Sequence, residues 1–200
     1  MSPGPSRGSF FSYTDPDMTT RYVAFLRAIN VGGRVVKMTA LKQLFEGLKL
    51  AEVETFIASG NVIFSSPAEA AKLEALIERG MQKGLGYEVT TFLRTTAEIA
   101  AIAQRDPFGV PMPPGGRIYV GFLRDKPAAG AKRKVADLAT PTDTLAVEGR
   151  ELYWLCATPS TESLISGATL EKTLGQPATL RNMNTVRRLA EKYRPFTPDR

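Results

Sequence analysis

The chain has 200 residues, a formal net charge of +6 and a hydrophobic fraction of 43%, which is ordinary for a globular protein. It contains no histidine and one cysteine. These counts exclude Ser-His-Asp and Cys-His catalysis, an intramolecular disulfide and a structural zinc site. No apolar run approaches the ~20 residues of a membrane-spanning helix. We therefore expect a cytoplasmic protein with no metal, no cofactor and no membrane contact.

Residues 1–18 contain neither a basic start nor a long apolar core, so they do not resemble a secretory signal. Their composition predicts a disordered N-terminal extension. Because Met18 stands next to the first hydrophobic run, the sequence leaves open whether translation starts at Met1 or Met18.

Residues 21–33, RYVAFLRAINVGG, are nearly all apolar as far as Ile29 and end in paired glycines. This predicts a strand buried in mid-sheet, followed by a turn. Hydrophobic spacing, turn residues and a capping box at Thr95 and Glu98 predict the next elements. They are a helix from Met38 to Leu48, strands over 53–58 and 62–65, a helix from Pro67 to Gly84 or Gly86, a strand over 87–93 and a helix to about Gln104. The order is β-α-β-β-α-β.

The pattern starts again at residues 119–124, YVGFLR, which lie 97 residues after YVAFLR. We expect a helix over 127–138, strands over 144–147 and 151–156, a helix from Ser160 to Gly175, a strand over 178–180 and a last helix from Asn182 to about Tyr193. The repeat predicts an α+β fold of two tandem ferredoxin-like (split βαβ) modules related by internal duplication. The expected divisions are an extension over 1–18, a first module with its extra helix over 19–108, a Pro/Gly linker over 109–116, a second module over 117–195 and a tail over 196–200.

Polar residues of the first module are expected at one edge of its sheet. In a split βαβ unit the strand that enters the hairpin points the same way as the first strand. The turn after the first strand and the hairpin tip therefore share an edge, and we predict a ligand site there from Arg27, Asn30, Gly32, Gly33, Ser59, Gly60 and Asn61. A glycine turn before a helix can bind an anion through backbone N–H groups. The alternative is that these residues only build tight turns.

Three further expectations concern Arg27, Arg124 and Arg181. Arg27 lies in an apolar strand, and a guanidinium without partners is costly to bury, so the hairpin tip or a bound anion is expected to satisfy it. Arg124 holds the matching place in the second module, without the Asn and Gly-Gly set. A second polar cluster, Arg181-Asn182-Met183-Asn184-Thr185, offers Arg181 and Asn184 to a ligand, or else serves only as a helix cap.

The motifs AFLRAINVGG, KM at a helix start, SGNVIF, DPF and TLRNMNTV resemble the domain-of-unknown-function family 1697 from about Arg21 to Tyr193. The resemblance implies a bacterial-type cytoplasmic protein with two ferredoxin-like modules. It carries the site residues named above, together with Asn182 and Thr185, and it implies no reaction. The sequence departs from the family pattern at Ala28, where glycine is usual, at Ala58, where glutamine is common, and at Met183, where tryptophan is common.

The function that the sequence favours is non-enzymatic binding of an anionic ligand, either a phosphorylated small molecule or nucleic acid. The net charge of +6 predicts weak, salt-dependent contact with nucleic acid. The alternative is an enzyme that acts on a phosphorylated or carboxylated small molecule without histidine catalysis. No pair of carboxylates stands at a telling spacing, so no catalytic residue is assigned, and the oligomeric state is left open.

Overall fold

The computed structural model describes residues 19–29, 35–57 and 60–194. Asn30, Gly32, Gly33, Ala58 and Ser59 lie outside the described residues. The extension predicted over 1–18 and the tail predicted over 196–200 lie outside them as well.

The first half of the chain alternates strands and helices in the predicted order. Its elements are β1 (Thr20–Leu26), α1 (Met38–Gly47), β2 (Ala51–Phe56), β3 (Asn61–Ser66), α2 (Ala70–Leu85), β4 (Thr91–Thr95) and α3 (Thr96–Ala103). The strands form one antiparallel sheet in the order β2-β3-β1-β4.

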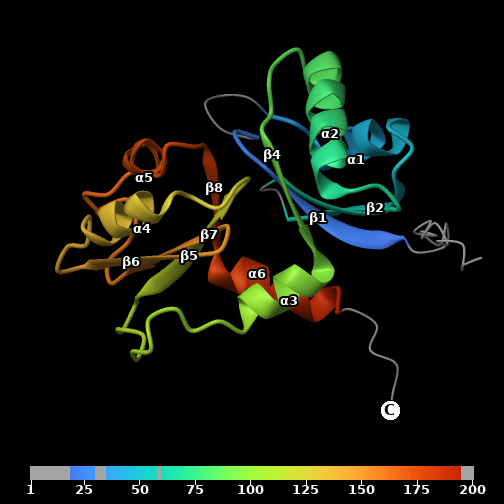
Figure 1. Cartoon of the computed structure of the whole chain (residues 1–200). Helices are drawn as coiled ribbons and strands as arrows, with labels where there is room; N and C mark the ends of the chain where they lie inside the picture. The colour runs from blue at the N-terminus through green and yellow to red at the C-terminus, as the bar shows by residue number, and fades with distance from the viewer. Residues whose placement is uncertain (1–18, 30–34, 58–59, 195–200) are drawn as a thin grey trace, which may run out of the picture.

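The second half has the same element order. Its elements are β5 (Arg117–Leu123), α4 (Ala129–Ala136), β6 (Asp143–Glu148), β7 (Glu151–Cys156), α5 (Gly167–Leu174), β8 (Ala178–Asn182) and α6 (Met183–Lys192). Their sheet, β6-β7-β5-β8, is again antiparallel throughout. The chain is therefore an α+β protein with two four-stranded sheets, each with its own pair of covering helices (Figure 1).

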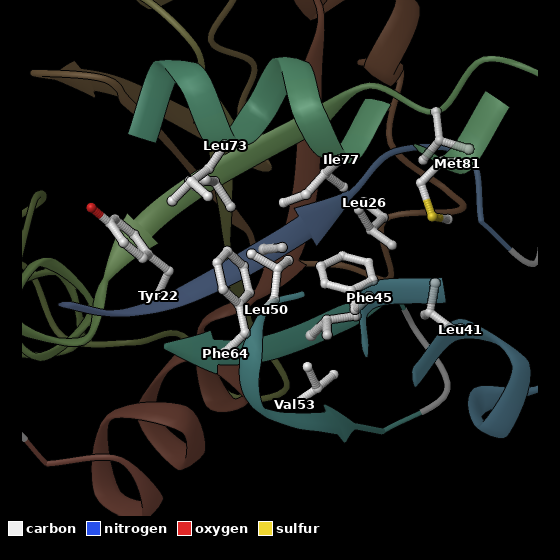
Figure 2. Packing of buried hydrophobic residues seen from close by; sticks show 14 of the residues in the cluster. Tyr22, Leu26, Leu41, Phe45, Leu50, Val53, Phe64, Leu73, Ile77 and Met81 are labelled. Carbon is white, nitrogen blue, oxygen red and sulfur yellow. The ribbon is translucent and has the colours of Figure 1, made fainter. Parts of the chain in front are cut away.

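The strand β1 is apolar from Tyr22 to Leu26 because both of its faces are buried there. Tyr22, Ala24 and Leu26 pack under α1 and α2, while Val23 and Phe25 point into a cluster shared with the second half. Figure 2 shows the first of these cores, where side chains of α1 and α2 meet Tyr22, Leu26 and Phe64 of the sheet. Each such side chain contributes about 1.5–3 kcal/mol when fully buried.

The shared cluster joins the two halves. The helices α3 and α6 pack against each other between the sheets (Figure 1). They cover apolar residues from the inner faces of both sheets, and Phe25 stacks on Phe122 with ring centroids 3.8 Å apart and planes 9° from parallel. Met183, where the family often has tryptophan, is 2% exposed in this cluster. One apolar core therefore spans the boundary between the two halves.

Several local predictions are confirmed. Thr95 and Glu98 form the capping box of α3, and the Asn182 side chain caps α6 by accepting from the N–H of Asn184. Gly86 and Gly175 end α2 and α5 in the left-handed conformation. Local signals of this kind are reliable because the bonds they need are made within three or four residues.

Other boundaries differ from the prediction. The helix α5 begins at Gly167 with Ser166 as its cap, not at Ser160. The hydroxyl of Ser160 instead forms a hydrogen bond with the hydroxyl of Tyr119. Ser160 is therefore engaged by a residue distant in sequence, and Ser166 caps the helix. The fourth strand starts at Thr91 rather than at residue 87. Ala28, where the family usually has glycine, has a φ of 61°, a left-handed conformation that glycine adopts without steric cost.

Candidate functional site

The predicted meeting of the β1 end and the β2–β3 turn is confirmed by the strand pairing. Both β1 and β2 run antiparallel to β3, so they point the same way. The N–H of Leu26 donates to the carbonyl oxygen of Gly60 at 2.9 Å, and Phe25 pairs with Asn61. Of the predicted site residues that the structure describes, Gly60, Asn61 and Arg181 meet at this edge.

The guanidinium of Arg27 reaches across to the second half of the chain, although the backbone N–H of Arg27 donates to the Thr90 carbonyl of its own half. Its Nε and Nη2 donate to the two carboxylate oxygens of Glu171 in α5, each at 2.8 Å. Among the described residues, the partner of the Arg27 guanidinium is therefore a carboxylate of the other half, where the sequence predicted the hairpin tip or a bound anion. The interaction is a bidentate ion pair between the halves, and Glu171 also accepts the N–H of Ala178. Arg27 acts here as a structural cation.

Arg124 makes the corresponding contact in the opposite direction. It pairs with Glu78 and lies 3.5 Å from Glu74, both in α2 of the first half. Arg27 and Arg124 are 97 positions apart in the sequence, and so are Glu74 and Glu171. Arg124 is thus a counterpart of Arg27 with carboxylate partners of its own.

Arg181 is a buried residue whose side chain donates hydrogen bonds to both halves of the chain. From β8 it reaches into the first half and donates to Asn61 Oδ1 at 2.7 Å, to the Leu26 carbonyl at 3.0 Å and to the Gly60 carbonyl at 3.4 Å. Its remaining donors meet Thr179 Oγ1 and the Leu180 carbonyl. The guanidinium lies 5.6 Å from the centre of the Phe25 ring. All these acceptors are neutral, and burial lowers the pKa of Arg181 to about 10.

Arg94 mirrors Arg181 from the other side. From β4 it donates to the carbonyls of Leu123 and Arg150, each at 2.9 Å, and lies 5.5 Å from the centre of the Phe122 ring. Its Nε, however, donates to a carboxylate oxygen of Glu151 at 2.7 Å. Burial lowers the pKa of Arg94, and the neighbouring Glu151 opposes that shift.

The two buried arginines therefore differ in charge compensation. Arg94 has Glu151 beside it, whereas Asn61 occupies the matching place beside Arg181. The guanidinium of Arg181 keeps its positive charge at neutral pH because a pKa of about 10 is well above that pH. The edge at Gly60 and Asn61 thus lies beside a buried positive charge whose hydrogen-bond acceptors, among the residues that the structure describes, are neutral.

Asn184 lies in the first turn of α6. It is exposed near the start of α6, where its backbone N–H is capped by Asn182. The contact that the structure shows for Asn184 is thus part of the helix cap.

Asp143 is a buried carboxylate that the sequence analysis did not single out. It accepts hydrogen bonds from the hydroxyls of Thr140, Thr142 and Ser163 and from the indole N–H of Trp154. Burial alone raises the pKa of Asp143, but these four hydrogen bonds together outweigh burial and lower it. The carboxylate holds the start of β6, the strand β7 and the segment before α5 together.

Because its pKa is lowered by folding, Asp143 should stabilise the protein above its unfolded pKa of about 3.9, and this contribution should disappear as the pH falls through the lower folded value. Asp143→Asn should lower the free energy of unfolding at pH 7 by about 1–3 kcal/mol. The gap to the wild type should narrow at pH 3. Urea unfolding at both pH values, followed by Trp154 fluorescence, measures this, and a gap that widens in acid would contradict the assignment.

Cys156 is buried next to Asp143, and burial raises the pKa of its thiol to about 12. Cys156 therefore packs as a small apolar residue, because the reactive form of a cysteine is the thiolate and burial disfavours it. Among the described residues, no cluster of three metal-ligating side chains is present, and no helix is long and apolar enough to cross a membrane.

The fold and these contacts define a two-sheet α+β protein whose halves are held together by reciprocal arginines. The family described as "Protein of unknown function (DUF1697)" matches residues 18–153, and the chain belongs to this family. A solved structure, that of the conserved bacterial protein SP0830 from Streptococcus pneumoniae, is similar with a TM-score of 0.69 and 22% identity, over 88% of this chain and 98% of that one. No curated protein matches the sequence.

Proposed function

We propose that the protein is a non-enzymatic binding protein for a phosphorylated or carboxylated anion, held where the β2–β3 turn meets the end of β1. The observation that carries the proposal is the buried charge of Arg181, which donates only to neutral acceptors within the described part of the chain. A nearby negative charge stabilises a buried cation. The matching Arg94 has such a charge beside it, the carboxylate of Glu151. A bound anion would fill that role for Arg181.

The guanidinium would act through its electric field, because its N–H groups already donate to protein acceptors. Direct contacts to the anion would come from other groups at the same edge. Asn30, Gly32, Gly33 and Ser59 remain the candidates from the sequence. Nucleic acid remains a weaker candidate ligand, and its binding should fall steeply with salt because it depends on counterion release.

The test is a titration of the protein with inorganic phosphate, a nucleoside monophosphate and a short single-stranded oligonucleotide, measured by calorimetry at low and high salt. Asn61→Asp introduces a carboxylate beside Arg181, as Glu151 stands beside Arg94. It should keep the fold, with a loss of about 1 kcal/mol for the bond from Asn61 to the Phe56 carbonyl, and weaken anion binding at least tenfold.

Glu151→Gln is the matched control, because it changes the charge beside the other buried arginine. Its affinity for the anion should equal that of the wild type. Equal binding by wild type and Asn61→Asp, or no binding of any of the three anions, would exclude this site.

We also propose that the two halves are ferredoxin-like modules that arose by internal duplication. The same strand order in both sheets supports this, as do the identical residues 97 positions apart in β1 and β5 and at Glu74 and Glu171. A cytoplasmic location is proposed as well, because the single cysteine allows no internal disulfide.

A further inference from the structure

A hollow of about 320 Å³ opens beside the segment that connects α3 to β5. This segment provides Phe108, Val110 and Met112, and the inner face of the second sheet provides Ile118 and Leu155, which are paired neighbours in β5 and β7. The volume is within the range of sites for small organic ligands. The proline- and glycine-rich segment that the sequence marks as a linker therefore forms one wall of a pocket.

Two large hydrophobic side chains of this wall are exposed to solvent. Val110 is 56% exposed and Met112 45%, and both are among the few large hydrophobic residues that the described part of the chain leaves exposed. Isolated exposed hydrophobic residues need no explanation, but these two line the same hollow together with three further hydrophobic residues, Phe108, Ile118 and Leu155. Such a lining favours a ligand with an apolar body.

The polar residues around the hollow determine which head group fits. Arg105 pairs with Glu148, and the Asp106 carboxylate accepts the N–H groups of Phe108 and Gly109. Arg187 of α6 is exposed and lines the hollow, and it has no hydrogen bond or ion pair to any residue within 19–29, 35–57 or 60–194. The available charge at the rim is therefore positive.

The matching corner of the first sheet is already filled. There the ring of Tyr193 meets Phe56 edge-on at 6.4 Å, and the guanidinium of Arg21 lies 4.9 Å from the centre of the Tyr193 ring. Ile118 stands where the 97-residue offset places the equivalent of Arg21. In the first half the protein thus packs an aromatic body beside an arginine, and in the second half the corresponding place is open.

We propose that this hollow binds a small amphipathic anion, whose apolar body packs on Val110, Met112 and Phe108 and whose carboxylate or phosphate pairs with Arg187. The inference is independent of the proposed site at Arg181, because the two sites share no residue. A ligand of this class needs one charge-assisted pair and an apolar wall, and the hollow has both.

The probe is 8-anilinonaphthalene-1-sulfonate, an aromatic anion whose fluorescence rises in apolar surroundings. The wild type should bind it saturably, and octanoate should displace it at much lower concentration than uncharged 1-octanol. Arg187→Gln should weaken probe binding at least fivefold, and Met112→Asp should abolish it by placing a negative charge on the apolar wall. Both side chains are exposed, so circular dichroism and the melting temperature should be unchanged.

Arg133→Gln is the matched control, since it removes the same charge from an exposed position on α4. It should bind the probe like the wild type. The proposal is overturned if Arg187→Gln and Arg133→Gln bind equally well, if octanol competes as strongly as octanoate, or if the folded wild type binds no probe.

Discussion

Replacing Glu151 with alanine is expected to lower the free energy of unfolding by about 3–5 kcal/mol, because it leaves a buried guanidinium without its counter-charge. The side chain of Arg94 is 0% exposed and that of Glu151 13% exposed, and their atoms are 2.7 Å apart. Urea unfolding followed by the fluorescence of Trp154, the one tryptophan of the chain, measures the change.

Two further variants isolate the cause. Glu151→Gln keeps an acceptor and removes the charge, which reproduces the neutral surroundings of Arg181, so its loss should be about 1–2 kcal/mol. Glu148→Ala removes the partner of Arg105 in an exposed ion pair and should cost less than about 1 kcal/mol. If Glu148→Ala destabilised the protein as much as Glu151→Ala, burial would not be the reason for the effect.

Phe122→Ala should lower the free energy of unfolding by about 3–5 kcal/mol, the range for removing a buried aromatic side chain from a close-packed core. The ring of Phe122 is fully buried, stacks on Phe25 and lies beneath the guanidinium of Arg94. The measurement is again urea unfolding, with circular dichroism as a second probe of the whole fold.

The double variant Phe25→Ala/Phe122→Ala tests whether the rings act as a pair across the halves. The stability losses caused by substitutions at two residues in direct contact are not additive. The double variant should therefore lose less stability than the sum of the losses in the two single variants. Strict additivity would mean that each ring is held by its own half. Such a result would argue against a core shared between the halves.

Local signals in the sequence predicted much of the fold. The capping box at Thr95 and the left-handed glycines Gly86 and Gly175 need only neighbouring residues, and they are where the sequence placed them. The apolar run of β1 likewise predicts a strand with two buried faces, and both faces are buried. Such features are readable because their physical cause is short-range.

The contacts between the halves could not be predicted in the same way. Arg27 finds its partner 144 positions away, and nothing near either residue indicates the other. The 97-residue repeat contained one signal for this contact. Arginine recurs at positions 27 and 124, and glutamate recurs at positions 74 and 171. Arg94 and Glu151 give no such signal, because Asn61 replaces the acid in the counterpart pair.

The reciprocal arginines have a consequence for the assembly of the chain. The carbonyl of Leu26 accepts a hydrogen bond from Arg181, and the carbonyl of Leu123 accepts one from Arg94. Each half therefore provides the donor for a buried carbonyl of the other half. Severed between α3 and β5, the two fragments would each lack the cation that seals the end of the first strand, and they would regain it by complementation. Two intact copies that exchanged halves would form the same two contacts in each pair of halves, with the segment between α3 and β5 as the hinge of the swap.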